Sequence, residues 1–421
     1  MLLSRKAVPL RVSKTYQPVF LVRYKLSGAD VEIEGIPDVL IREGRGYFIR
    51  DVKMARRIDE QHHPEIVLQL QLYGWLFEQS CGTPPEALEV WGGTNEITEI
   101  PYDGGKAALK ALERLLETIQ CGDQRYEPVG WSKCDGCGFR DKCWPEAQAV
   151  VHVALILGVD RGLARKLHEL GIGSTEALLV NFDATKLGQL KRTYGGREQK
   201  VGKTAMRILQ RAEAMRGRNE RILVRPVLPA GPNWVMFDLE GMPPHLDDLK
   251  KVYMWGMQVF GERPSEYLAS VADFGPNGDR DCWFDFLRNA KHLFKAYGEI
   301  HFVHWASYEE TKLDVYSARY GDPDGTAARL KSKLFDLLKT TRDSMVLPLP
   351  SLSLKVVEEY IGFKRSQTEY GGDWSMAMFI EATEVNDEIK RRELMAAIKK
   401  YNQEDLEATW AVFQWLKSKV S

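Results

Sequence analysis

This sequence lacks any apolar run that approaches the roughly eighteen residues needed to span a membrane. Its first residues, MLLSRKAVPL, also lack the apolar core and the small-residue cleavage site of a secretory signal. We therefore expect a cytoplasmic protein without membrane contact. At 421 residues the chain is too long for one hydrophobic core, so two or three domains are expected.

A strong charge of one sign is also missing, because 58 Lys and Arg nearly balance 59 Asp and Glu. The whole chain is therefore not biased towards a polyanion. Locally the balance changes: residues 161–226 contain fifteen Lys and Arg but six Asp and Glu. A basic segment within a neutral chain suggests contact with a polyanion, and a solvated helical surface is the alternative.

Cysteine is scarce, with six residues in the whole chain, which excludes a disulfide-rich scaffold. Three of the cysteines nevertheless fall close together, at Cys134, Cys137 and Cys143. In a chain without an export signal, such clustering favours metal or iron–sulfur ligation over disulfides.

Four acidic residues in the C-terminal half stand where strands and one helix are predicted. The apolar run WVMF ends at Asp238, and Glu240 follows two residues later, on the same face of a strand. IHFVHW leads to Glu309, and YNQEDLEAT places Tyr401 and Asp405 four apart, on one face of a helix. Four converging carboxylates would repel one another unless divalent cations neutralised them. Such cations can clamp a phosphodiester.

These motifs resemble the DEDD exonuclease superfamily of the RNase H-like fold, whose motifs are D-x-E, H-N-x-x-F-D and Y-x-x-x-D. The resemblance implies 3′–5′ exonuclease activity, two Mg²⁺ or Mn²⁺ ions on the four acids, and a role for Tyr401 in positioning the attacking water. The second motif departs from the pattern, since Glu309 replaces the usual Asp and Trp305 the usual Asn. The rate and metal preference therefore stay open. LPSLSLKVVEEYIGF further resembles a segment of the YprB-like subgroup.

A second constellation lies near the N-terminus. GIPD ends a predicted strand at Asp38, and DVK runs from Asp51 to Lys53 in the next strand. A helix is predicted from about Pro64 to Gln79, and it carries QLQLY from Gln69 to Tyr73. The two aspartates could share a metal, and the lysine could activate a water or stabilise a pentacovalent phosphate.

This order of motifs resembles the RecB family of PD-(D/E)xK nucleases, which use G-x-x-D, D-x-K and Q-x-x-x-Y. The cysteine spacing resembles the C-terminal cluster of the iron–sulfur RecB-like nucleases, whose fourth thiolate comes from a helix before the first strand. Here the chain begins almost at that strand, so we expect a truncated domain, with Cys121 as a candidate fourth ligand. A [4Fe-4S] cluster, Zn²⁺ and unliganded thiols remain alternatives.

The basic middle segment has two short helical patterns around a Gly-Ile-Gly turn, with Ser174 as the predicted N-cap of the second helix. It resembles a helix-hairpin-helix module, in which backbone N–H groups bind a phosphate. A plain helical spacer is the alternative. Residues 150–216 are predicted to be helical, with Gly-containing breaks at 171–173, 188 and 195–196, and RILVRPVLPAGPN (residues 221–233) resembles a linker. The candidate nucleic-acid-binding residues are Arg161, Arg165, Lys166, Gly171, Gly173, Lys203 and Arg207, supplemented by Arg211.

Together these features resemble a bacterial family of RecB-like nucleases fused to a ribonuclease H-like domain. We expect an α/β multidomain protein: a truncated PD-(D/E)xK restriction-endonuclease-like domain (1–147), a helix-hairpin-helix domain (148–226) and an RNase H-like exonuclease domain (227–421). The expected function is metal-dependent hydrolysis of nucleic acid, with DNA favoured over RNA. Two alternatives are a nucleic-acid-binding scaffold with degenerate sites and a structural iron–sulfur or zinc subunit of a repair complex.

Overall fold

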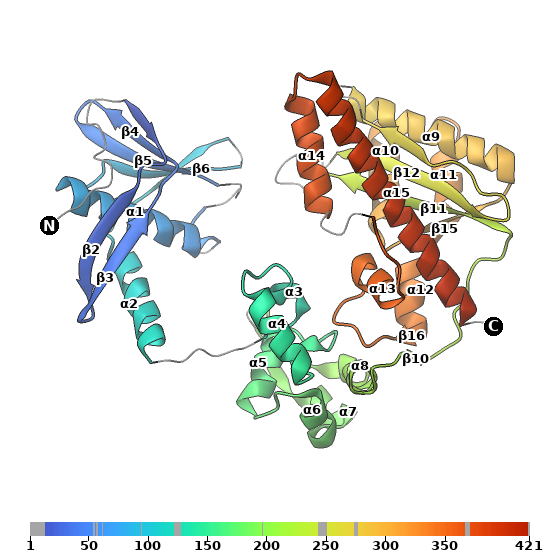
Figure 1. Ribbon diagram of the computed structural model, residues 1–421, viewed down its shortest axis with the longest axis horizontal. Helices are drawn as coiled ribbons and strands as arrows, with labels where there is room; N and C mark the ends of the chain where they lie inside the picture. Colours follow the sequence, from blue (N-terminus) through green and yellow to red (C-terminus); the bar gives the residue numbers. More distant parts are fainter. Residues whose placement is uncertain are drawn as a thin grey trace. The chain divides into compact units, whose positions relative to one another are not determined.

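The computed structural model describes residues 13–419 except positions 54, 56–57, 61, 94, 122–127, 196, 243–250, 273–276 and 367–370. The described residues form two compact units, one between residues 13 and 121 and one between residues 128 and 419 (Figure 1). Within these described ranges, no helix combines the length and the apolar character that crossing a bilayer requires.

The first unit is a five-stranded sheet in the order β1-β4-β5-β6-β7, with a separate β2–β3 hairpin. Strands β5 and β6 are parallel, so a crossover is needed between them, and α1 provides it. Its elements are β1 (Lys14–Tyr16), β2 (Phe20–Leu26), β3 (Ala29–Gly35), β4 (Val39–Glu43), β5 (Gly46–Val52), α1 (Pro64–Cys81), β6 (Ala87–Trp91), β7 (Ile97–Ile100) and α2 (Lys106–Gln120).

Helix α1 anchors the core of this unit. Leu70, Leu76 and Phe77 are fully buried, in one cluster with Ile49 of β5 and Leu88 of β6. The predicted helix from about residue 64 to 79 is confirmed, and Pro64 is favoured at its start because a first-turn N–H has no helical partner. Packing of α1 against the sheet fixes the strand ends that carry the N-terminal motifs.

The second unit begins with a mostly helical part. Its elements are α3 (Trp131–Cys134), α4 (Arg140–Ala149), η1 (Val153–Leu155), α5 (Arg161–Glu169), α6 (Thr175–Asn181), α7 (Ala184–Gln189), β8 (Lys191–Tyr194), β9 (Arg197–Lys200), η2 (Gly202–Thr204) and α8 (Ala205–Gly217). The predicted cap is confirmed, because the Ser174 hydroxyl accepts a hydrogen bond from the Ala177 N–H at 3.1 Å.

Two parts of this region differ from the sequence-based predictions. The segment from 191 to 200 was expected to be helical, but it forms the antiparallel β8–β9 hairpin. The pair Gly195–Gly196 at the centre of this segment is typical of a hairpin turn as well as of a helix break, and the sequence alone favoured the helix break. The segment from 221 to 233 was expected to be a linker, but its first two residues form β10 (Arg221–Ile222), which pairs with β16 (Met345–Val346).

The remainder of the second unit is a five-stranded sheet in the order β13-β12-β11-β14-β15, antiparallel from β13 to β11 and parallel from β11 to β15. Its elements are β11 (Asn233–Gly241), β12 (Val252–Gly261), β13 (Leu268–Val271), α9 (Gly278–Tyr297), β14 (His301–His304), α10 (Tyr308–Tyr320), α11 (Thr326–Lys331), β15 (Leu334–Asp336), α12 (Leu337–Ser344), α13 (Leu354–Tyr360), α14 (Gly372–Glu384) and α15 (Glu388–Ser418).

Strand β11 is buried on both faces, and its residues alternate between two cores. Val235 and Phe237 pack in the cluster that contains the buried residues of α9. Trp234 and Met236 pack in the cluster that contains the C-terminal residues of α15. Figure 1 shows α15 crossing the face of this sheet. Since side chains alternate with period two, the next residues of the α15 face are Asp238 and Glu240.

Candidate active sites

Three carboxylates meet between β11 and α15. Asp238, Glu240 and Asp405 each offer an oxygen, and these oxygens all lie within 4.8 Å of one another. Glu240 is 7% exposed and Asp405 is 9% exposed. Two of the acids come from alternate positions of β11, and the third comes from the face of α15 that packs on it. The expected convergence of the first and third motifs is therefore present.

The neighbour of Asp238 is Asn402, whose Nδ2 donates to Asp238 Oδ2 at 2.7 Å. The amide is held in turn by Tyr267, whose hydroxyl donates to Asn402 Oδ1 at 2.8 Å. Room for this amide exists because Gly256 stands directly opposite Asp238 on β12. A Cβ at position 256 would collide with Asn402 Oδ1. The glycine therefore allows α15 to orient the Asp238 carboxylate.

Asp405 has a cationic partner of its own. Arg365 Nη2 lies 2.5 Å from Asp405 Oδ1, and the same guanidinium holds Glu358 through Nε at 2.5 Å and Nη2 at 2.7 Å. The Arg365 and Glu358 side chains are each 6% exposed. This ion pair fixes Asp405 and contributes one positive charge, so the group of three acids keeps an excess of negative charge.

Burial and mutual repulsion shift all three acids in the same direction. Burial raises the pKa of Asp238 well above its usual value, with further contributions from Asp405 and Glu240. Burial, and then the charge of Asp405, raises the pKa of Glu240 to about 8. Burial also raises the pKa of Asp405, although Arg365 opposes the shift. Carboxylate oxygens that are costly to ionise alone fit a hard divalent cation such as Mg²⁺ or Mn²⁺.

Glu309 lies beside this group but outside it. It is in the first turn of α10 and is 3% exposed, and its Oε2 lies 3.4 Å from His304 Nδ1. Burial raises its pKa, and His304 lowers it. Its charge also helps to raise the pKa of Asp238. The turn before it contains Ala306 at φ 78°, a left-handed conformation that L-residues adopt at a cost. The second motif therefore places an acid near the group of three acids without bringing it into ligand contact with them.

Tyr401 lies one helical turn before Asp405 on α15 and is 5% exposed. Burial raises the pKa of its hydroxyl, and Asp405 raises it further. Its ring packs against cations, with Lys355 Nζ 5.6 Å and Arg365 Cζ 5.7 Å from the ring centroid. The hydroxyl therefore stays protonated and can donate a hydrogen bond near the acids.

The first unit brings the N-terminal motifs together. Asp51 on β5 is 2% exposed, and its Oδ2 lies 2.6 Å from Lys53 Nζ. Asp38 follows β3, accepts from the Val52 N–H at 2.7 Å, and donates its own N–H to Asp51 Oδ1 at 3.2 Å. Burial raises the pKa of Asp51, Lys53 lowers it, and Asp38 raises it. Both aspartates and the lysine thus share one small site.

Helix α1 adds the third motif to this site. Gln69 Nε2 donates to the Tyr73 hydroxyl at 2.7 Å. Burial raises the pKa of Tyr73, and the charge of Asp51 raises it further. Gly35 at the end of β3 lets the Tyr73 ring lie close to the backbone, since a Cβ at position 35 would be 2.9 Å from Tyr73 Cδ1. The five predicted residues are therefore neighbours.

The cysteines are adjacent but form no compact ligand group. Cys134 is buried at the end of α3, Cys137 is exposed, and Cys143 is partly buried in α4. Burial raises the pKa of Cys143, and the other two thiols contribute to the shift. Among the described residues, three thiol sulfurs within 4.8 Å of one another are not found. Cys121 is exposed at the end of α2, in the other unit.

The predicted basic residues divide into exposed and inward-facing groups. Arg161, Arg165 and Lys203 are exposed, and Lys166 is partly exposed. Gly171 has φ 75°, as the predicted turn requires. Arg211 faces inward: its Nη1 donates to the Leu157 carbonyl at 2.9 Å, and burial lowers its pKa to about 10. The expectation that Arg211 supplements a phosphate site is therefore not supported.

Arg207 also faces inward, whereas Gly173 has free space around it. Arg207 is partly buried, and its Nη1 has no hydrogen-bond partner in the described part of the chain. Gly173 has open space at its Cα, because an added Cβ would meet no described atom within 4 Å.

Sequence reasoning did not identify several residues that organise the C-terminal site. Asn402 stands next to a motif tyrosine, so its position was a usable signal. Arg365 and Gly256 lie outside all motifs, and Glu358 lies in the segment LPSLSLKVVEEYIGF, to which no site role was assigned. Only the packing of α13 and β12 against α15 brings these residues to the acids. His304 was part of the second motif, but its pairing with Glu309 was not foreseen.

Comparisons with known proteins match two parts of the chain to two families. Residues 4–144 match the family model of the PD-(D/E)XK nuclease superfamily, and residues 235–417 match that of the RNase H superfamily. None of the curated proteins matches the chain. A solved structure described as "Crystal structure of SSO0001" is 22% identical over 31% of this chain, with a TM-score of 0.23. This chain covers 60% of that protein's length.

The two family models thus cover separate parts of the chain, each of which contains one of the two sites described above. The chain therefore joins a PD-(D/E)XK nuclease superfamily domain to an RNase H superfamily domain.

Proposed function

We propose that this chain is a metal-dependent nuclease that hydrolyses phosphodiester bonds of nucleic acid, DNA in preference to RNA. In this proposal the C-terminal domain is a DEDD-type 3′–5′ exonuclease that uses two divalent ions. The observation that carries the proposal is the buried group of Asp238, Glu240 and Asp405, whose oxygens lie within 4.8 Å of one another.

The charges of this group support a role in binding cations. Three carboxylates face one guanidinium, that of Arg365, which is shared with Glu358. Burying like charges without compensation is costly, so retaining three acids here favours a function that uses their charge. When bound, divalent ions would generate a nucleophilic water and stabilise the leaving 3′ oxygen. Glu309 would supply the fourth carboxylate.

The roles of the surrounding residues follow from their contacts. Asn402 and Arg365 orient Asp238 and Asp405, respectively, so two of the ligand oxygens are fixed before substrate arrives. Tyr401 keeps its proton, because burial and Asp405 raise its pKa, and it would donate a hydrogen bond to the attacking water. Its hydroxyl is therefore a positioning group rather than a base.

The N-terminal domain would be a second, RecB-like centre. Asp38 and Asp51 would hold a metal ion, and Lys53 would stabilise the phosphate, with Gln69 and Tyr73 orienting the site. The contacts among these residues support this reading. We further propose that Cys134, Cys137 and Cys143 bind an iron–sulfur cluster or Zn²⁺, with Cys121 as the candidate fourth ligand. Residues 148–226 would be a helix-hairpin-helix domain that binds nucleic acid.

The test is a time course on end-labelled single-stranded DNA and RNA with Mn²⁺ or Mg²⁺, comparing wild type with Asp238→Ala and Asp51→Ala. A 3′–5′ ladder that disappears in Asp238→Ala but persists in Asp51→Ala would support the C-terminal assignment. Cleavage that survives in the double variant Asp238→Ala/Asp51→Ala would contradict both proposed centres. The direction of the ladder reports the polarity.

One observation favours a second function, that of a nucleic-acid-binding scaffold with a degenerate C-terminal site. Glu309 lies outside the group of three acids and pairs with His304. If a fourth ligand is needed, the domain would bind metal weakly and would not cut. The same time course separates the two functions, since with a degenerate C-terminal site the products of Asp238→Ala would be the same as those of wild type, and any cleavage would disappear in Asp51→Ala.

A further inference from the structure

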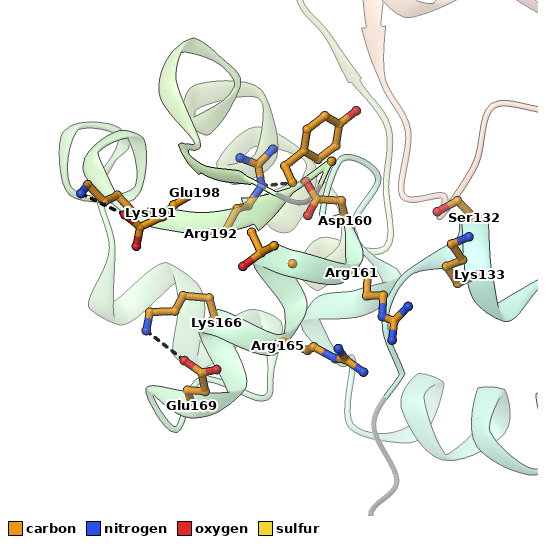
Figure 2. Close-up of a pocket in the computed structure, with 14 residues that line it drawn as sticks. Ser132, Lys133, Asp160, Arg161, Arg165, Lys166, Glu169, Lys191, Arg192 and Glu198 are labelled. Carbon is orange, nitrogen blue, oxygen red and sulfur yellow. Dashed lines mark hydrogen bonds and ion pairs between the residues drawn. The ribbon is translucent and has the colours of Figure 1, made fainter. Parts of the chain in front are cut away.

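A cleft of 850 Å³ opens in the helical part of the second unit. It lies between α5, the β8–β9 hairpin and the short helix α3 (Figure 2). This cleft is a different place from the Gly-Ile-Gly turn, which the sequence associates with phosphate binding. Neither Gly171 nor Gly173 lines it. The residues that line it are Ser132, Lys133, Asp160, Arg161, Gly162, Arg165, Lys166, Glu169, Lys191, Arg192, Thr193, Tyr194, Gly195 and Glu198.

Six of these residues are basic, and three of the six are neutralised by ion pairs. The pairs are Lys166 with Glu169 at 2.9 Å, Lys191 with Glu198 at 3.1 Å, and Arg192 with Asp160 at 2.7 Å. They use all three acids that line the cleft.

The other three cations, Lys133, Arg161 and Arg165, are exposed and make no side-chain ion pair in the described part of the chain. Arg161 and Arg165 are one helical turn apart on α5, and in Figure 2 both guanidinium groups extend to the side on which Lys133 lies. The cleft thus has a net positive charge that is concentrated in one place.

The walls of the cleft are held in place by Asp160. Its Oδ1 accepts from the Leu163 N–H at 3.0 Å and caps α5, while its Oδ2 accepts from Arg192 Nε of the hairpin. Gly162 lets the two elements touch, because a Cβ there would collide with the Thr193 carbonyl oxygen. The cations are therefore presented by a pre-formed surface.

An aromatic ring completes the cleft. Tyr194, at the end of β8, is 53% exposed although it belongs to a hairpin that contacts α5. The Arg192 guanidinium lies 5.0 Å from its ring centroid. An exposed ring in the same cleft as cations without an ion pair among the described residues is the combination that single-strand-binding proteins use, with a base on the ring and phosphates on the cations.

We propose that this cleft binds a single-stranded segment of nucleic acid. Lys133, Arg161 and Arg165 contact successive phosphates, and Tyr194 stacks on a base. A single strand fits because its bases can leave the stack, whereas a duplex keeps its bases paired and presents only backbone. The proposal takes the identity of the polymer from the proposed nuclease function, and the cleft would feed or retain the strand on which the nuclease acts.

The test measures binding without cleavage. Fluorescence anisotropy of a labelled twenty-nucleotide single-stranded DNA is followed with the full chain in chelator, over a range of salt concentrations. Arg161→Ala/Arg165→Ala should lower affinity at least tenfold and flatten the slope of log K against log salt by about 1.4, roughly 0.7 for each lost phosphate contact. Tyr194→Ala should lower affinity roughly tenfold and leave the salt slope unchanged.

The matched control is Lys191→Ala/Glu198→Ala, which removes two side chains of the same cleft without changing its net charge. It should bind within about twofold of wild type. The thermal melting of each variant reports whether it folds. An arginine double variant that folds and binds with an unchanged salt slope would overturn the proposal, as would a duplex of the same length that binds more tightly than the single strand.

The two proposals can fail separately. If wild type binds the strand but no metal supports cleavage, the cleft assignment stands and the nuclease proposal falls. If wild type cleaves and the cleft variants bind normally, the cleft assignment falls.

Discussion

Replacing Asp238 by asparagine should stabilise the metal-free protein while removing its response to metal. The side chain keeps its shape, and its Oδ1 can still accept from Asn402, which now donates to Asp238 Oδ2 at 2.7 Å. What disappears is one negative charge from a group whose members raise one another's pKa. In the absence of metal this charge opposes folding, and in its presence the charge holds the ion.

The size of the effect follows from the spacing of the acids. Two unit charges within 4.8 Å of each other repel by about 3 kcal/mol at the effective dielectric constant of ~20 that describes buried protein sites. For a domain of this size, each kcal/mol moves the melting temperature by roughly 2–4 °C. We therefore expect Asp238→Asn to melt about 6–12 °C above wild type in chelator above pH 8, where Glu240 is ionised.

The effect should depend on pH with a definite sign. Because the pKa of Glu240 is raised to about 8, the folded protein holds a proton that the unfolded chain has already lost above its ordinary value of 4.5. The unfolding free energy of the metal-free wild type therefore falls as pH rises between these values. The gain from Asp238→Asn should be small near pH 5 and largest above pH 8.

The assay is calorimetric melting of wild type and variant in chelator and in Mn²⁺, at pH 5, 7 and 8.5. Mn²⁺ should raise the melting temperature of wild type by mass action and raise that of the variant much less. Asp343→Asn is the control, since this exposed acid pairs with Lys339 and its charge is already compensated. A variant that is less stable than wild type in chelator, or that responds equally to Mn²⁺, would refute the reasoning.

Three further predictions concern other parts of the chain. Lys53→Met should leave Asp51 buried without its partner at 2.6 Å, cost about 2 kcal/mol in urea unfolding, and abolish any cleavage that remains in an Asp238→Ala background. Gly162→Ala should cost about 2 kcal/mol, measured by the same method, because its Cβ would push the Thr193 carbonyl away from α5. Burial lowers the pKa of His152 from 6.5 to about 4. The free energy of unfolding should therefore be fully present above pH 6.5 and fall by up to about 3 kcal/mol as pH falls to 4, because the unfolded chain takes up a proton that the folded protein resists. In the variant His152→Gln, the melting temperature should fall less between pH 6.5 and pH 4 than it does in wild type.

The sequence predicted the parts of the C-terminal site that depend on local geometry. Asp238 and Glu240 share a face because strand residues alternate, and Tyr401 and Asp405 share a face because a helix repeats every 3.6 residues. The alternation of β11 between two cores confirms the first inference. The family order of the motifs then indicated that the strand and the helix meet.

The rest depends on contacts between segments that are distant in sequence. Arg365 reaches Asp405 only because α13 and the residues after it fold back on α15. Gly256 matters only because antiparallel pairing sets it opposite Asp238. Glu309 stands at the predicted position in its motif, but the turn at Ala306 directs it towards His304. Residue periodicity does not contain this information.

The arrangement around Asp405 explains how a protein can keep such a site folded. One guanidinium, shared by Glu358 and Asp405, compensates part of the charge and is itself almost fully buried. If Arg365 balanced all of the charge, the acids would have little affinity for a further cation. With no such arginine, the metal-free domain would carry an uncompensated buried group of carboxylates, at a cost of several kcal/mol for each ion. Because Arg365 compensates only part of the charge, the domain can fold without metal and the acids can still bind a divalent cation.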